Sequence, residues 1–374
     1  MVKLLHTADI HLGGEFAFLG DRGKEYRTQL LATFDKIIDM AIAEKVSLFL
    51  IAGDLFNTNR VHGVVVGKVL AAFKKLDGEG IRVCILPGTH DVYNDESIYR
   101  FVSFPPNVTV LTPENNHHIY HDLDATVYGR AFDGKTYSES PLKGLSLVSE
   151  TKLHIGMAHC SIKIPEKVER ETMLLDRSEI ANSGFDYMAL GHWHSFHDYS
   201  QGSTKAFYCG SPEPISMDQE GAGNVVLVTV QGKGDVTVTP CRVGSKQFDG
   251  LHINIGLVNE TADIVKFIEA RANPDLILKV TLEGLCSTGL NPNSKELEDS
   301  LGKQFFCLRV MDKWQPKLDE VTTDNFPEET VTGKFIKLMR DKIALASNEE
   351  DKELSKEALK LGFALLRGHL QVIE

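Results

Sequence analysis

Short apolar runs that stop at residues able to bind a metal recur five times along this chain. The clearest run covers residues 46–51 and is followed closely by Gly53-Asp54. This pattern is typical of a buried strand that delivers one polar side chain to the edge of a sheet. The other four runs end at Asp9 and His11, at His90 and Asp91, at His159, and at His192 and His194.

The segments between the first three runs have the spacing of amphipathic helices, with apolar residues at every third or fourth position. The predicted strands cover residues 1–8, 46–51 and 81–86, and the predicted helices cover residues 26–45 and 63–76. Strands that alternate with helices in this way favour a parallel sheet with right-handed crossovers.

Shorter β runs follow and extend the α/β pattern. We predict strands at 108–111, 118–120, 125–129, 153–158, 187–190, 207–212, 225–230 and 236–243, and a short helix at 177–183. The last two strands form a hairpin across Gly232-Lys233-Gly234, because glycine tolerates the backbone angles of tight turns. Residues 1–248 are therefore predicted to form one α/β domain with its helices outside.

A second, smaller part is predicted between residues 249 and 314. Strand-like and helix-like runs alternate there around a central strand at 276–282. This alternation predicts a small α/β cap domain.

Residues 315–374 are predicted to contain a linker, which begins near Trp314, and two helices at about 331–346 and 351–370. The second helix carries a broad apolar stripe between Leu354 and Leu366. That stripe either docks on its own domain or binds a partner.

The composition is that of an ordinary globular protein, with 374 residues, 42% hydrophobic and 25% charged. No apolar run approaches the roughly 20 residues that span a membrane, and the first residues lack a signal-peptide pattern. The six cysteines form no CxxC pair, which favours reduced thiols and a cytoplasmic location. The net charge of −12 does not favour DNA. Bound cations or a basic partner subunit would make the local charge positive where DNA binds.

The residue types at the five strand ends form a borderline ligand set of carboxylates and imidazoles. Such a set suits manganese, iron or zinc better than calcium. The six candidate ligands are Asp9, His11, Asp54, His159, His192 and His194. Because six exceed the need of one ion, we predict two ions that share Asp54, an arrangement that supports displacement at phosphorus. His90, next to Asp91, is a natural general acid for the leaving oxygen.

Any one of these motifs occurs often by chance, so the prediction rests on all five together. Other histidines have a simpler interpretation. His6 and His154 lie inside strand runs and are predicted to be core or sheet-face residues. His117, His118 and His121 lie in a turn-rich segment and are predicted to be solvated.

The five motifs resemble the calcineurin-like metallophosphoesterase superfamily, whose pattern is DxH, GDxx, GNHD or GNHE, H, and GHxH. Three segments look like the SbcD-type nucleases, the phosphoesterase subunits of DNA double-strand-break repair complexes. These are residues 5–13 (LHTADIHLG), 53–56 (GDLF) and 209–213 (CGSPE). The end at 361–366 (LGFALL) looks like the shorter, YhaO-type members. The resemblance implies a four-layer α/β/β/α sandwich with a small α/β cap and C-terminal helices.

The resemblance also implies a role for each candidate residue. Asp9, His11 and His194 would hold the first ion, and His159 and His192 the second. Asp54 would bridge both ions, His90 would act on the leaving group, and Asp91 would orient His90. The expected metal is Mn²⁺. The expected reactions are exonuclease cleavage of duplex ends and endonuclease cleavage of single strands or hairpins. The expected partners are DNA, a second copy of the chain and an SbcC-like ABC-type ATPase with a long coiled coil.

One departure from the family pattern bears on the metals. Gly88-Thr89-His90-Asp91 stands where the family has GNHD, so Thr89 replaces an asparagine that would donate its amide oxygen to the second ion. The threonine hydroxyl is shorter and a poorer donor at that distance. Either a water fills the gap or the second ion binds weakly. A smaller departure is Asn57, where many relatives carry Asp or His.

Three functions therefore stay open at the level of sequence. The first is a two-metal DNA exonuclease and endonuclease that works with an ATPase. The second is a small-molecule or nucleotide phosphodiesterase of the same superfamily, which the net charge favours. The third is a weakly active scaffold subunit, which Thr89 favours.

Overall fold

The computed structural model describes residues 1–134, 139–148, 150–164, 173–218, 220–287, 290, 292–316 and 327–366. The chain divides into two compact units, Met1–Phe248 and Asp249–Glu374. Each unit has its own hydrophobic core. Most of the linker predicted after residue 314, and the end of the helix predicted to reach residue 370, fall outside the described residues.

The first sheet of the larger unit has six strands in the order β14-β13-β1-β2-β3-β4. The strands are β1 (Val2–Thr7), β2 (Leu48–Ala52), β3 (Arg82–Leu86), β4 (Val108–Val110), β13 (Asn224–Gly232) and β14 (Asp235–Arg242). The first four run parallel, and the β13–β14 hairpin adds to β1 antiparallel. Thr7 pairs with Ile51, and Ile51 pairs with Ile85, so β1, β2 and β3 end level with one another.

The second sheet also has six strands, in the order β11-β12-β10-β7-β6-β5. The strands are β5 (His117–Tyr120), β6 (Ala125–Gly129), β7 (Leu153–His159), β10 (Tyr187–Gly191), β11 (His197–Asp198) and β12 (Lys205–Tyr208). Its centre is parallel, and both of its edges are antiparallel. Two short strands, β8 (Ser161–Ile162) and β9 (Leu174–Leu175), pair separately.

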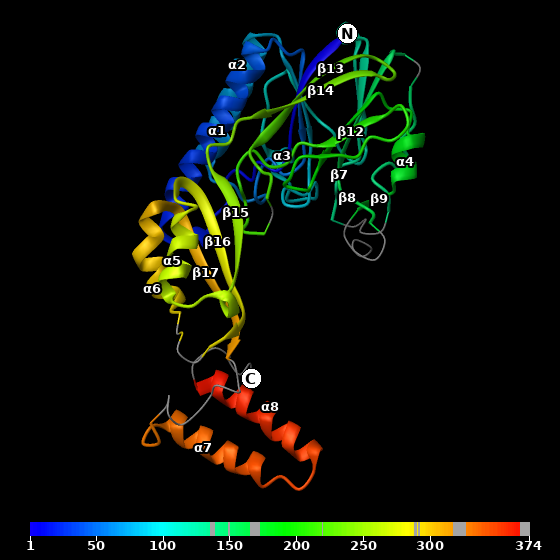
Figure 1. The fold of residues 1–374 in the computed structure, drawn as a ribbon. Helices are drawn as coiled ribbons and strands as arrows, with labels where there is room; N and C mark the ends of the chain where they lie inside the picture. The colour runs from blue at the N-terminus through cyan, green and yellow to red at the C-terminus, as the bar shows by residue number, and fades with distance from the viewer. Residues whose placement is uncertain are drawn as a thin grey trace. The chain divides into compact units, whose positions relative to one another are not determined.

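The core of the larger unit lies between the two sheets. Leu4 and Leu50 from the first sheet and Ile155 and Ala189 from the second belong to one buried cluster. Helices α1 (Gly23–Ala43) and α2 (Gly63–Gly78) lie on one side of the sandwich, and α4 (Arg177–Asn182) lies on the opposite side (Figure 1). A one-turn helix, α3 (Ile98–Phe101), follows β3. The predicted α/β/β/α sandwich is confirmed.

The smaller unit begins with a three-stranded sheet in the order β15-β16-β17. Its elements are β15 (Gln247–Asn254), α5 (Thr261–Glu269), β16 (Asn273–Cys286), α6 (Ser294–Leu301) and β17 (Phe305–Pro316). Trp314, which was predicted to begin a linker, instead lies in β17 and is buried in the core of this unit. The indole ring gains more from this burial than from exposure in a loop.

Two further helices, α7 (Val331–Ala344) and α8 (Glu349–Leu366), pack against each other. Leu359 and Phe363 of α8 are buried against Ile336 of α7, whereas Leu354 is exposed. The hairpin therefore covers part of the predicted apolar stripe and leaves part of it exposed. None of the helices that the structure describes combines the length and apolar character of a membrane span.

A second predicted boundary also differs from the structure. The strand expected at 207–212 is β12, which spans Lys205–Tyr208. The chain leaves the sheet because Gly210 adopts a positive φ of 75°, and Ser211 then donates its backbone N–H to the carbonyl of His194 at 3.1 Å. This turn anchors the segment that follows β10.

His6 is a core histidine, as predicted. It is fully buried, and its Nδ1 lies 2.9 Å from the hydroxyl of Tyr187 on the other sheet. Burial lowers the pKa of His6 from 6.5 to about 3. The unfolded chain therefore takes up a proton at this residue before the folded chain does. The stability contributed by the neutral imidazole is complete above pH 6.5 and is lost as the pH falls toward 3.

We expect His6→Gln to reduce this acid sensitivity. Between pH 7 and pH 5 the His6 titration costs the wild type about 2 kcal/mol of unfolding free energy, which the variant does not lose. Urea unfolding of metal-free protein at both pH values measures the difference. His252→Gln, at an exposed histidine, is the control and should keep the wild-type pH dependence. Equal pH dependence of wild type and His6→Gln would contradict this expectation.

Candidate metal centre

The candidate ligands lie where four parallel strands end. Asp9 and His11 follow β1, Asp54 follows β2, His159 ends β7, and His192 and His194 follow β10. The loops after β1 and β2 are joined by backbone hydrogen bonds. Asp9 donates its N–H to the carbonyl of Gly53 at 3.1 Å, and His11 donates to the carbonyl of Asp54 at 3.0 Å. These bonds hold the two carboxylates at one edge of the sandwich.

Four of these residues have the left-handed backbone that side chains other than glycine rarely adopt. The φ angles are 54° at Asp9, 53° at His11, 53° at Asp54 and 101° at His192. Such conformations cost of order 1–3 kcal/mol each and persist only where the surrounding structure enforces them. Their concentration at the strand ends marks this edge as the functional part of the domain.

Glycines allow the close approach of these loops. A Cβ at Gly53 would overlap the imidazole of His159, and a Cβ at Gly88 would overlap the carboxylate of Asp54. The GD and GT pairs of the sequence therefore have a steric reason, because only glycine leaves room for these side chains.

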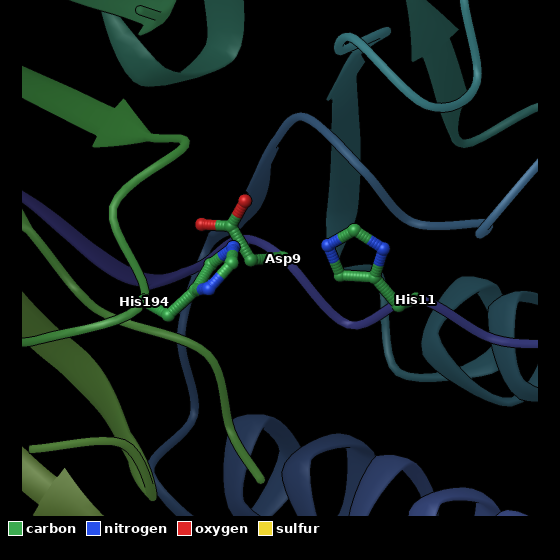
Figure 2. Close-up of side chains that lie close together, drawn as sticks. All are labelled: Asp9, His11 and His194. Carbon is green, nitrogen blue, oxygen red and sulfur yellow. The ribbon is translucent and has the colours of Figure 1, made fainter. Parts of the chain in front are cut away.

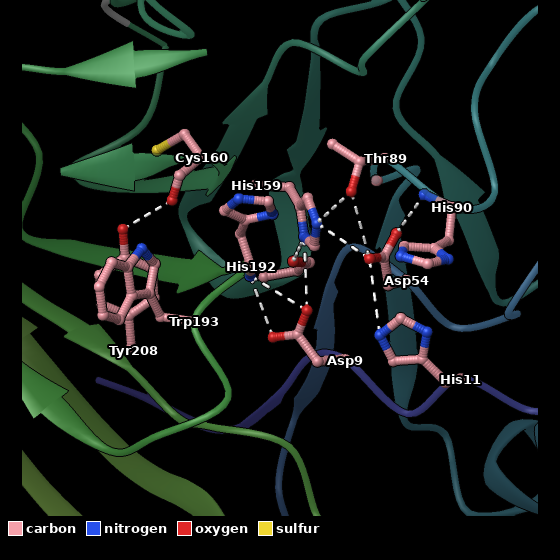
Figure 3. A network of polar contacts seen from close by, with 12 residues as sticks. Asp9, His11, Asp54, Thr89, His90, His159, Cys160, His192, Trp193 and Tyr208 are labelled. Carbon is pink, nitrogen blue, oxygen red and sulfur yellow. Dashed lines mark hydrogen bonds and ion pairs between the residues drawn. The ribbon is translucent and has the colours of Figure 1, made fainter. Parts of the chain in front are cut away.

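The ligand atoms form three overlapping groups, each with its members within 4.8 Å of one another (Figures 2 and 3). The groups are Asp9, His11 and His194; His11, Asp54 and His90; and Asp9, Asp54 and His159. Asp9, His11 and Asp54 each belong to two groups. A carboxylate shared in this way has the position required of a bridge between two ions.

Asp54 is at the centre of these contacts and is 2% exposed. Its Oδ1 accepts the backbone N–H of His90 at 2.8 Å, and its Oδ2 lies 3.2 Å from Nε2 of His159 and 3.6 Å from Nε2 of His11 (Figure 3). Burial opposes its ionisation, but the neighbouring His159 outweighs burial and lowers the pKa of Asp54 below its ordinary value. Asp54 is therefore ionised and ready to bind a cation.

A backbone carbonyl of β2 orients the imidazole of His159. Its Nδ1 lies 2.9 Å from the carbonyl of Ala52, which fixes the tautomer that protonates Nδ1 and turns Nε2 toward Asp54. Burial alone would lower the pKa of His159, but the carboxylate of Asp54 raises it to about 10. A cation beside Asp54 would take the place of that proton.

His192 differs from the other predicted ligands. Among the described residues it lies outside the three groups. Its backbone N–H donates to both oxygens of Asp9, at 3.0 and 3.1 Å, and its ring lies beside that of His159 with 5.2 Å between centroids. His192 thus orients Asp9 through its backbone, and its ring lies beside the His159 side of the centre.

The site fits divalent cations. Burial lowers the pKa of His11 to about 3 and the pKa values of His192 and His194 to about 4, so these imidazoles are neutral at pH 7. Nε2 of His11 is buried and has no hydrogen-bond partner in the part of the chain that the structure describes. A buried imidazole nitrogen that accepts no hydrogen bond and lies near a carboxylate is typical of a metal ligand.

Comparison with known proteins gives this site a family. Residues 2–196, more than half of the chain, match the model of the calcineurin-like phosphoesterases. The chain belongs to this family. Its members are metal-dependent phosphoesterases that use divalent ions, so the resemblance stated from the five motifs is confirmed.

Individual relatives are distant. The chain is 25% identical over 244 residues to the uncharacterized metallophosphoesterase YhaO of Bacillus subtilis, covering 63% of this chain and 59% of YhaO. It is 26% identical over 298 residues to the DNA double-strand break repair protein Mre11 of Sulfolobus acidocaldarius, covering 76% and 75%. It is 23% identical over 292 residues to Mre11 of Halobacterium salinarum, covering 76% and 71%. The chain therefore spans less than two thirds of the length of YhaO.

Asp91 is held by groups on three segments near the site. Its carboxylate accepts the backbone N–H groups of Gly88 at 2.7 Å and Phe56 at 3.1 Å, and the hydroxyl of Tyr99 at 2.6 Å. Nδ1 of His90 lies instead 3.2 Å from the carbonyl of Asn57. Asp91 therefore ties the loops after β2 and β3 together, and a backbone carbonyl orients His90. The role of Asp91 in orienting His90 therefore stays a prediction.

Two supporting contacts were not predicted from the sequence. Tyr99, in α3, donates its hydroxyl to Asp91. Trp193, which stands between the two histidines of the GHxH motif, donates its indole N–H to Oγ of Ser161 at 3.2 Å. No local pattern signals the Tyr99 contact. The Trp193 contact had one signal, since an indole that is at least partly buried usually finds an acceptor for its N–H.

Thr89 occupies the position of the family asparagine. Its hydroxyl lies 3.4 Å from Oδ2 of Asp54 and 3.4 Å from Nε2 of His159, between the carboxylate and the imidazole (Figure 3). Both distances are at the limit of a hydrogen bond, so the hydroxyl faces this side of the centre without binding either group tightly.

Proposed function

We propose that the chain is a Mn²⁺-dependent DNA nuclease, with exonuclease and endonuclease activity, that acts in double-strand-break repair. The observation that carries this proposal is the set of three overlapping ligand groups around Asp54 in a member of a phosphoesterase family. Relatives whose names describe double-strand break repair support the choice of DNA over other phosphodiesters.

In this proposal Asp9, His11 and His194 hold one ion, and Asp54 is shared with a second ion held by His159 and His192. Two divalent ions would stabilise the attacking and leaving oxygens and lower the pKa of a water nucleophile. His90 has a different task. Its ring centroid is 4.6 Å from that of His11, and its side chain is exposed, so it can donate a proton to the leaving oxygen.

The same proposal assigns the parts of the chain. Residues 1–248 form the nuclease domain, 249–314 the cap, and 315–374 the linker and partner-binding helices. The exposed leucines of α7 and α8, among them Leu338 and Leu354, suit a partner that is itself helical, such as an SbcC-like coiled-coil ATPase. A basic partner would supply the positive groove that a chain of net charge −12 lacks. We also propose a homodimer and a cytoplasmic location.

An assay of the purified chain tests the nuclease. Linear duplex, hairpin DNA and bis(p-nitrophenyl) phosphate are each incubated with Mn²⁺ or with EDTA. We expect Mn²⁺-dependent cleavage of DNA that EDTA abolishes. Hydrolysis of the generic ester without cleavage of DNA would replace the nuclease by a small-molecule phosphodiesterase. Absence of all hydrolysis would support the scaffold subunit. Recovery of activity in Thr89→Asn would then identify Thr89 as the cause of the lost activity.

A further inference from the structure

A groove of about 630 Å³ adjoins the candidate metal centre, within the size range of small-ligand sites. His11, His90 and His194 line its inner end. Its remaining lining comes from three segments of the larger unit, residues 13–18, residues 57–60, and residues 215–216. The groove therefore offers space beside a phosphodiester held at these histidines.

The wall of the groove is aromatic and firmly held. Phe16 is 8% exposed and packs edge to face on Tyr26 with 5.0 Å between centroids, and Phe18 packs edge to face on Phe16 at 6.3 Å. The hydroxyl of Tyr26 donates to the carbonyl of Pro214, which fixes the opposite segment at residues 215–216. Phe18 is half-buried and belongs to the lining of the groove.

The charges of the groove are balanced. Apart from the histidines, its lining carries one carboxylate, Glu15, and one guanidinium, Arg60. The side chain of Arg60 is 88% exposed, and its pairing with Glu96 at 3.5 Å is open to solvent, so the guanidinium can turn to another anion. A groove with one charge of each sign and an aromatic wall suits a flat, polar-edged ring better than a run of phosphates.

We propose that this groove binds the nucleoside next to the scissile phosphate, with the base stacked on Phe18 and the following phosphate within reach of Arg60. Bases stack on aromatic side chains without regard to sequence, because every base has a π face. The inference rests on the proposed function for the cleaved phosphodiester and adds the chemical class of one of its two ester groups. It places specificity for nucleic acid in the segment at residues 13–18.

The test compares two chromogenic esters that share a leaving group, the p-nitrophenyl ester of thymidine 5′-monophosphate and bis(p-nitrophenyl) phosphate. With Mn²⁺, we expect the wild type to show a kcat/KM at least tenfold higher for the nucleoside ester. Phe18→Ala should lose about tenfold on the nucleoside ester, mainly in KM, and stay within twofold on the generic ester. Phe18→Tyr keeps the ring and should retain the preference. Phe101→Ala, an exposed phenylalanine outside the groove, is the matched control.

The outcomes separate the groove from the nuclease. If the wild type hydrolyses the nucleoside ester no better than the generic ester, the proposal that the groove binds a nucleoside is wrong, whether or not the protein cleaves DNA. Equal losses of Phe18→Ala on both esters also overturn it, because they indicate a structural role. A clear preference for the nucleoside ester that depends on Phe18, without cleavage of any DNA, would support nucleoside binding in the groove. It would contradict the proposed DNA nuclease activity.

Discussion

Replacing Asp54 by asparagine is expected to abolish metal-dependent phosphodiester hydrolysis while the protein stays folded. Asp54 is a buried carboxylate that two ligand groups share, and its Oδ2 lies within 3.6 Å of both His11 and His159. An amide keeps the shape but removes the negative charge that would bridge two cations. We expect kcat/KM to fall by at least about a thousandfold, which corresponds to about 4 kcal/mol of lost transition-state stabilisation.

The measurement is Mn²⁺-dependent hydrolysis of bis(p-nitrophenyl) phosphate, with calorimetric Mn²⁺ titration of the same protein. The variant should also lose its stoichiometry of two ions. Asp186→Asn is the matched control, because Asp186 is equally buried at 2% exposure but accepts the backbone N–H of His154, away from the site. Retention of wild-type activity in Asp54→Asn would refute the proposed bridge.

Restoring the family asparagine at position 89 is expected to equalise the two metal sites. In the wild type the hydroxyl of Thr89 lies 3.4 Å from Asp54 and from His159, and a threonine oxygen cannot extend as far as an asparagine amide oxygen. We expect wild-type Mn²⁺ titrations to show two affinities at least about tenfold apart, a difference of about 1.4 kcal/mol. Thr89→Asn should bring the two dissociation constants within about threefold of each other by tightening the weaker one.

Thr89→Val provides the control for this experiment, because it keeps the shape of threonine and removes its oxygen. Its second site should be no tighter than that of the wild type. Calorimetric titration of metal-free protein reports each site without requiring activity. Two equal, tight Mn²⁺ sites in the wild type would show that Thr89 does not weaken the second ion, and the scaffold hypothesis would then lose its main support.

The sequence predicted most of the secondary structure because burial patterns are local. The three/four spacing of Leu30, Phe34 and Ile37 in α1 and the continuous apolar run of β2 follow from which side of each element faces the core. The errors occurred at element ends. Trp314 extended β17 and Gly210 ended β12 early, and both outcomes depend on contacts with residues distant in the sequence.

The composition of the candidate site was also predictable, but its contacts were not. The motifs identify Asp9, Asp54 and the histidines because each stands at the end of an apolar run. Nothing local shows that Asp91 bonds to Tyr99 and to two backbone N–H groups, or that His192 orients Asp9 through its backbone. The Asp91 contacts join the loops after β2 and β3, and the His192 contact joins loops from the two sheets, so both exist only in the folded domain.

By itself, the sequence determined the family, the α/β alternation and the residue types available at the strand ends. Those properties depend on hydrophobic period and on chemical identity, which the chain carries at each position. Only the tertiary structure decided that Asp54 lies in two of the ligand groups and that the carbonyl of Asn57 faces Nδ1 of His90. It also decided that an aromatic groove adjoins the histidines. The reason is geometric, because each of these features is a distance between residues from different strands and loops.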